Sequence, residues 1–314
     1  MRRHLTPRLL FSLLCVFLAF LIPLSLYIGV VKIPLSSLFS SEIIIEMRAP
    51  RITMAFLVGS SLAVAGAVVQ GVFRNPLAEP YLLGISSGAI LGYSLSFFFR
   101  EELAIPLAFL FSTFPISLII LASTSKEKTI LLGISISFLT SSMASLLMYL
   151  SGERLYKIFL WIMGCFHFST WKQVLFFFPV CSSYFLLVSL FYRELNSLQF
   201  GDEYAEQTGV DPTKYRKVFL LSSSFLVSVS VVFSGVIGFV GLVVPHLVRL
   251  LTGRGNYKYL IPNSILLGGI LTLLADDLSR LVLAPREIPV GIVTSITGSP
   301  ILIYLLWRES KWHF

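Results

Sequence analysis

Charged residues are scarce in this 314-residue chain: Asp, Glu, Lys and Arg together make up only 13% of it. Soluble domains carry about 25%, and disordered chains lack the 56% hydrophobic content found here. The composition therefore excludes a water-soluble globular enzyme and a disordered chain. The apolar surface must face lipid, and the length allows roughly ten helices of ~20 apolar residues with their loops.

Signals for nucleotide, metal and disulfide sites are also missing. The dipeptide Gly-Lys occurs nowhere, so the chain has no P-loop with which to bind ATP itself. The four histidines are scattered, and neither a His-x-x-x-His nor a Cys-x-x-Cys spacing occurs, so we expect no metal site and no cofactor in this chain. The three cysteines are interpreted as small apolar residues; they are Cys15, Cys165 and Cys181.

The first apolar run, Leu9 to Val31, follows three arginines. It is too long for the apolar part of a signal peptide, and no small-residue cleavage site follows it. We therefore expect a retained first helix whose N-terminus lies in the cytoplasm. The arginines are Arg2, Arg3 and Arg8.

Nine further apolar spans bring the expected number of membrane helices to ten. They are residues 52–73, 82–99, 105–123, 129–150, 173–192, 217–234, 236–251, 259–283 and 288–307. The stretch 158–168 is too short to cross and predicts a half-helix or re-entrant segment. The predicted fold class is an all-α polytopic membrane protein with both termini cytoplasmic, forming a single transmembrane domain over residues 1–314.

The net charge of +8 is interpreted through membrane topology rather than nucleic-acid binding. In the ten-helix arrangement, fifteen of the 24 Lys and Arg residues fall on the cytoplasmic side, as the positive-inside rule requires. Nine remain outside and need their own explanation. They are Lys32, Arg48, Arg51, Arg100, Arg154, Lys157, Lys172, Arg280 and Arg286.

The longest polar segment, residues 193–217, has the signals of an ordered structure. Asp202 is placed to cap a short helix over Tyr204–Thr208, and Gly209 to end it in a left-handed conformation. Asp211-Pro212 then predicts the start of the next helix. The segment is interpreted as a rigid projection on the cytoplasmic face, and the alternative is a structured connector.

Few ionisable residues fall inside the apolar spans. Asp276 and Asp277 lie near the outer end of the ninth span, and the i,i+4 spacing of Asp276 and Arg280 favours a structural salt bridge over a proton relay. His246 follows Pro245, and a lone histidine there favours a hydrogen-bonded packing role over a ligand role.

Small and hydroxylated residues mark two spans. Gly59, Gly66 and Gly71 in the second span predict close helix packing. Serines of the fifth span share one helix face at i,i+4 spacing, which fits helix packing and a weakly polar pathway wall equally well. The candidate pathway residues are Ser137, Ser141, Ser142 and Ser145.

Three groups of motifs extend over nearly the whole chain. The first comprises M-R-A-P-R-I (Met47–Ile52), Gly59, Gly66, Gln70, N-P-L-A-E-P (Asn75–Pro80) and L-G-I-S-S-G (Leu83–Gly88). The second is S-G-V-I-G-F-V-G-L-V-V-P-H (Ser234–His246) with Arg249, and the third is E-I-P-V-G (Glu287–Gly291) with G-S-P (Gly298–Pro300). Together they resemble the FecCD family of ABC importer permeases. The structural motif positions are Asn75, Pro76, Gly241, Pro245 and His246.

The resemblance implies ten helices per subunit and a multi-pass protein of a bacterial or archaeal cytoplasmic membrane. It implies a homodimer or a pair of permeases, two ABC ATPase subunits that bind ATP and Mg, and an extracytoplasmic substrate-binding protein. It also implies that Arg48, Arg51 and Arg280 dock that binding protein. The segment 193–217 becomes the ATPase coupling element, with coupling residues Gly201, Asp202, Glu203, Ala205 and Gly209. Thr208 departs from the pattern, since the family usually has Leu there.

The function expected from this resemblance is import of an iron chelate, such as a ferric siderophore, from a binding protein into the cytoplasm. Cobalamin or haem import by the same machinery is the alternative. Two other classes remain open at this stage. Asp276 and Asp277 suggest a proton-coupled carrier, and those carboxylates with His246 suggest a membrane-embedded enzyme.

Overall fold

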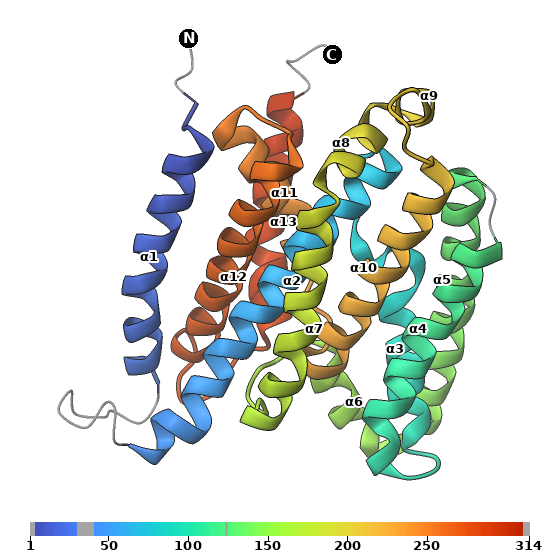
Figure 1. Cartoon of the computed structure of the whole chain (residues 1–314). Helices are drawn as coiled ribbons and strands as arrows, with labels where there is room; N and C mark the ends of the chain where they lie inside the picture. Colours follow the sequence, from blue (N-terminus) through green and yellow to red (C-terminus); the bar gives the residue numbers. More distant parts are fainter. Residues whose placement is uncertain (1–3, 30–40, 123–124, 310–314) are drawn as a thin grey trace.

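The computed structural model describes residues 4–29, 41–122 and 125–309, and the regular elements of this part are helices that run mostly along one direction (Figure 1). Ten of them match the ten expected spans, which confirms the predicted all-α polytopic fold. They are α1 (Pro7–Tyr27), α2 (Ala49–Phe73), α3 (Ile85–Ser96), α4 (Ala104–Ala122), α5 (Lys126–Leu150), α7 (Trp171–Leu190), α10 (Pro212–Ser234), α11 (Val240–Thr252), α12 (Tyr257–Leu281) and α13 (Val290–Glu309).

The shorter elements lie between these helices. The expected half-helix is α6 (Leu155–Ile162), and the cytoplasmic segment contains α8 (Tyr192–Phe200) and α9 (Asp202–Gln207). Four short turns complete the described part: a π-helix, η2 (Ile43–Arg48), and the 3-10 helices η3 (Pro80–Leu83), η4 (Glu101–Leu103) and η5 (Gly152–Arg154).

Seven helices of the described residues are long and apolar enough to cross a membrane by themselves. The other three of the ten, α3, α11 and α13, lack such an 18-residue window in the described residues and pack within the same bundle.

The beginning of α1 and the end of α13 lie at the end of the bundle that carries α8 and α9 (Figure 1). This arrangement agrees with an even number of crossings. Parts of two expected spans, residues 30–31 and 123, lie outside the described residues, as do Arg2, Arg3 and Lys32.

Helix α2 forms the centre of the bundle and contacts α7, α10, α11 and α12. Its glycines allow these contacts, as the sequence predicts. A Cβ atom on Gly59 would overlap the carbonyl oxygen of Gly268 in α12, and one on Gly66 would overlap the carbonyl oxygen of Gly241 in α11. Backbones approach this closely only where neither residue has a side chain.

Candidate functional site

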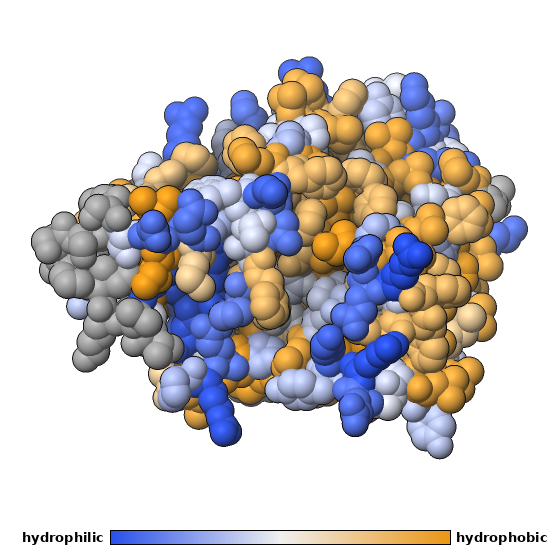
Figure 2. Space-filling view, turned by 90° about the horizontal axis from the view of Figure 1, so that it is seen from below, coloured by the Kyte–Doolittle hydropathy of each residue, from blue (hydrophilic) through white to orange (hydrophobic). Residues whose placement is uncertain are grey.

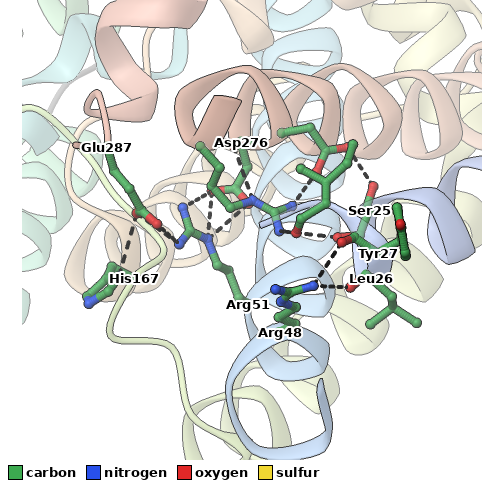
Figure 3. A network of polar contacts seen from close by, with 11 residues as sticks. Ser25, Leu26, Tyr27, Arg48, Arg51, His167, Asp276 and Glu287 are labelled. Carbon is green, nitrogen blue, oxygen red and sulfur yellow. Dashed lines mark hydrogen bonds and ion pairs between the residues drawn. The ribbon is translucent and has the colours of Figure 1, made fainter. Parts of the chain in front are cut away.

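The outer end of the bundle holds a cluster of ion pairs that joins five chain segments (Figure 3). Arg51 of α2 donates from Nη2 to Asp276 Oδ1 at 2.8 Å, and from Nη1 to Glu287 Oε2 at 2.9 Å. The Asp276 carboxylate is fully buried, and Arg280 Nε lies 3.2 Å from its Oδ2. Asp276 thus lies between two guanidinium groups, and its predicted salt bridge to Arg280 is confirmed.

The remaining contacts join α1 to α12 and to η2, the short helix that leads into α2. Arg280 also pairs with Asp277 and donates to the carbonyl oxygen of Ile28 at 2.8 Å. Ser25 Oγ donates to Asp277 Oδ2 at 2.6 Å. Arg48 Nη1 donates to the carbonyl oxygens at the end of α1, those of Leu26 and Tyr27, at 2.8 and 2.9 Å. The C-terminal carbonyls of a helix carry partial negative charge, so they suit this cation.

This geometry corrects one expectation. Arg48, Arg51 and Arg280 lie at the outer end, but their relative exposures are 7%, 7% and 3%, so they do not lie on the surface. The carboxylates that pair with Arg51 and Arg280 belong to the same chain, and Arg48 donates to backbone carbonyls of α1; such partners inside the bundle avoid an unpaired buried charge. Docking of a binding protein at these arginines stays a prediction.

Glu287 is a residue of this cluster to which the sequence reasoning gave no role. It accepts from Arg51, and its Oε2 lies 3.5 Å from His167 Nδ1, so it links α2 to the loop that follows α6. Its place in the third motif was the available signal, but its partners are more than 100 positions away in the chain.

At the outer end of the bundle, backbone hydrogen bonds join three segments: the loop after α6, the end of α10 and the start of α13. Cys165 N donates to Ser234 O at 2.9 Å, and Val290 N donates to Gly164 O at 2.8 Å. Gly164 and Gly235 have φ angles of +74° and +69°, which L side chains rarely adopt. The second and third motifs therefore encode one junction at which α10 ends and α13 begins.

Helix α11 begins inside the bundle, beside Gly66 of α2. The segment before it is irregular, and Phe239 has a φ of +67°. Two side chains from the loop after α2 hold this segment: Tyr81 donates to Ile237 O at 3.2 Å, and Glu79 Oε1 accepts from Phe239 N at 3.3 Å. Irregular backbone at membrane depth needs such partners. Glu79 is a second residue whose role the sequence reasoning missed.

Further inward, α2 and α11 are joined by a polar side chain of the first motif. Gln70 Nε2 donates to the carbonyl oxygen of Leu242 at 3.2 Å, and its Oε1 accepts from Arg249 at 2.6 Å. Asn75 Oδ1 accepts from Leu77 N at 2.9 Å and so shapes the turn that follows α2. His246 is buried in α11, beside Pro245 within that helix.

At the opposite end, α9 projects from the bundle (Figure 1). Asp202 is its first residue, and no side chain caps the helix, so the predicted capping role of Asp202 is wrong. Its carboxylate instead accepts from Arg216 of α10 at 2.8 Å. Gly209 adopts the predicted positive φ, at +79°, and Asp211 caps α10 by accepting from Lys214 N at 3.0 Å.

The coupling residues divide into buried ones, which form the seat of α9 on the bundle, and ones on the exposed face of α9. Ala205 is 0% exposed, so its methyl group belongs to the seat and not to a docking surface. Glu203 and Tyr204 are exposed. Thr208, where the family usually has Leu, donates to Ala205 O at 2.8 Å and contacts Ser197 Oγ at 3.1 Å. Thr208 thus makes a polar contact with α8.

The serines of α5 lie on two kinds of surface. Ser141, Ser142 and Ser145 are exposed, whereas Ser137 is half-buried and donates to Gly133 O at 2.7 Å. Ser145 donates to Ser141 O at 2.9 Å. Their contacts within the helix fit a packing role and a pathway role alike.

Comparison with known proteins identifies the family. The model of the FecCD transport family matches residues 17–308. The chain belongs to the FecCD transport family. This FecCD protein is 37% identical to the hemin transport system permease protein HmuU of Yersinia pestis over 99% of both chains. It is 38% identical to the molybdate import system permease protein MolB of Haemophilus influenzae, over 86% of this chain and 82% of MolB.

Solved structures agree. A metal-chelate type ABC transporter in an inward-facing conformation superposes with a TM-score of 0.89 at 35% identity, over 96% of this chain and 99% of the other. The FecCD protein is therefore a multi-pass permease of the ABC importer type. HmuU and MolB are named for different cargoes at nearly equal identity to this chain, so overall similarity does not select a cargo.

Proposed function

We propose that this chain is the transmembrane subunit of an ATP-driven importer for an iron chelate, in the cytoplasmic membrane of a bacterium or archaeon. Two separate ABC ATPase subunits bind ATP and Mg and dock on α9, a second copy of the permease completes the pathway, and an extracytoplasmic binding protein delivers the cargo. The observation that carries the proposal is α9 itself, a short exposed helix fixed to α10 by the Asp202–Arg216 ion pair.

The ion-pair cluster argues against the proton-coupled carrier. Asp276 and Asp277 are each paired with arginine inside the bundle, and buried carboxylates paired in this way are typical of a structural ion-pair network. The cluster therefore supports a structural role.

The cargo is tested by measuring uptake of ferric siderophores, hemin and cobalamin into proteoliposomes that contain the permease, the ATPase and the binding protein. Iron-chelate uptake without hydrolysable ATP would contradict the ATP-driven mechanism, and exclusive uptake of hemin or cobalamin would contradict the cargo.

The end of α8 and the exposed face of α9 together offer an aromatic anchor for the ATPase. Phe200 and Tyr204 are 68% and 47% exposed, and their ring centroids lie 5.4 Å apart. Exposed aromatic residues are enriched among the residues that dominate protein interfaces.

Replacing Tyr204 with alanine should weaken ATPase binding about 30-fold, the equivalent of the ~2 kcal/mol typical of such anchors. Affinity between the detergent-solubilised permease and its ATPase measures this. The matched control is Tyr149→Ala, which removes an even more exposed tyrosine from the outer end of α5 and should leave affinity unchanged. Equal affinities for both variants and the wild type would contradict docking on α9.

The serines of α5 are proposed to line the pathway between two permease copies. Cysteines at Ser141, Ser142 and Ser145 should react with a water-soluble thiol reagent at rates that change when ATP binds. Met143 is exposed and lies on the opposite face of α5, so Met143→Cys is the lipid-facing control and should stay unreactive. Equal reactivity at all four positions would assign the serines to helix packing. The background lacks the native cysteines Cys15, Cys165 and Cys181.

Binding-protein docking is proposed to involve the outer face rather than the buried cluster alone. Hydrophilic side chains gather in patches on this face between hydrophobic ones (Figure 2). Arg286, beside Glu287 in the loop before α13, is exposed. An exposed guanidinium can pair with a carboxylate of a partner without first breaking an internal ion pair, which Arg51 and Arg280 would have to do.

A further inference from the structure

A groove of about 570 Å³ runs along the outside of the bundle, with α10 as its floor and α4 and α7 as its walls. It is lined mainly by apolar and hydroxyl side chains, among them Phe109 of α4, Leu187 of α7 and Phe225 of α10. Phe225 is 46% exposed, and the neighbouring surfaces of α4 and α7 present large exposed apolar residues such as Leu118 and Leu186. All three helices are candidate membrane spans, so the groove opens towards lipid.

Four hydroxyl groups of the groove already have backbone partners in their own helices. Ser117 donates to Thr113 O at 2.9 Å, Ser183 to Val180 O at 2.9 Å, and Ser222 to Val218 O at 2.8 Å. Thr113 donates in the same way to Phe109 O. These side chains therefore direct their donors into backbone carbonyls, and the groove presents the surface that a hydrocarbon chain requires rather than one that binds a polar ligand.

A cation lies one helical turn beyond the cytoplasmic end of the groove. Lys217 lies one helical turn before Leu221, on the same face of α10 as Leu221 and Phe225, which line the groove. Its Nζ donates to Leu121 O, near the end of α4, at 3.2 Å. An ammonium group has three donors, and this contact uses one of them. The inner leaflet is rich in anionic phospholipids, whose phosphates bind lysine as a point charge.

We propose that this groove binds one phospholipid of the cytoplasmic leaflet, with an acyl chain between α4 and α7 and its phosphate on Lys217. The apolar lining, the internally satisfied hydroxyls and the cation beyond the cytoplasmic end match the two ends of such a molecule. The lipid would contact the middle of α10. This helix contacts α9 at its cytoplasmic end and meets the start of α13 at its outer end.

Native mass spectrometry of the full-length permease, purified in mild detergent with added phosphatidylglycerol or phosphatidylcholine, tests the proposal. Ser183→Trp places an indole in the groove, and the matched control Ser182→Trp places it on the neighbouring exposed position outside the groove lining. We expect Ser183→Trp to lower the occupancy of one tightly bound lipid at least tenfold and Ser182→Trp to leave it unchanged. Equal occupancy in the two variants would overturn the proposal.

The head-group contact has its own test. Lys217→Gln should reduce the preference for phosphatidylglycerol over phosphatidylcholine about fivefold, whereas Lys214→Gln, an exposed lysine on the same helix, should not. Equal losses in both variants would overturn the assignment of the phosphate to Lys217.

Ser222→Leu fills the floor of the groove by a smaller amount than Ser183→Trp does. It replaces Ser183→Trp in the measurement of lipid occupancy if that variant does not reach the membrane.

Discussion

Replacing Asp276 with alanine should prevent most of the permease from folding in the membrane. The Asp276 carboxylate is 0% exposed and is shared by Arg51 and Arg280. Its removal takes the shared carboxylate from two buried guanidinium groups, so that Arg51 keeps only the carboxylate of Glu287 and Arg280 only that of Asp277, at a cost of about 3–5 kcal/mol. Since net stabilities are about 5–15 kcal/mol, this is a large share of the total. The measurements are the yield of monodisperse protein and the midpoint of unfolding by sodium dodecyl sulfate.

The matched control is Glu101→Ala at the same end of the bundle. Glu101 pairs with Lys157 at 3.2 Å, but both side chains are more than half exposed, so its loss should change stability by less than about 1 kcal/mol. Adding Arg51→Met to Asp276→Ala should recover part of the yield, because one uncompensated charge is then gone. Similar midpoints for Asp276→Ala and Glu101→Ala would contradict a structural role of the cluster.

The sequence predicts the helices well because hydrocarbon thickness sets their length. Spans of ~20 apolar residues are recognisable without any knowledge of their neighbours. Gly209 and Asp211-Pro212 were likewise predictable, since their backbone preferences are local. These features depend on a few residues that are adjacent in the chain.

It was not predictable in this way that the side chains of the outer arginines turn into the bundle. Arg51 lies 225 positions from Asp276 and 236 from Glu287, and only the packing of α2 against α12 brings them together. A charge near the end of a membrane helix reaches outward when no partner is near and turns inward when one is. The same limit applies to Glu79, whose partner is the backbone N–H of Phe239.

Replacing a glycine in the centre of the bundle separates the local effect of helix propensity from the tertiary effect of helix packing. Gly66→Ala should destabilise the permease and abolish transport, although helix propensity alone predicts a gain of up to about 1 kcal/mol from this change. A Cβ atom there would overlap the carbonyl group of Gly241, and a backbone group cannot rotate away. Overpacking typically costs about 1–3 kcal/mol, and moving α11 away from α2 would also strain the hydrogen bond from Gln70 to Leu242 O.

Gly238→Ala is the matched control, because a Cβ atom on Gly238 meets nothing within 4 Å. It lies in the irregular segment that leads into α11, so it tests whether that segment tolerates a methyl group where space is open. We expect wild-type unfolding midpoints and ATP-dependent uptake for Gly238→Ala, and lower values of both for Gly66→Ala. A stabilised Gly66→Ala variant would mean that α2 and α11 are farther apart than their backbone contact implies.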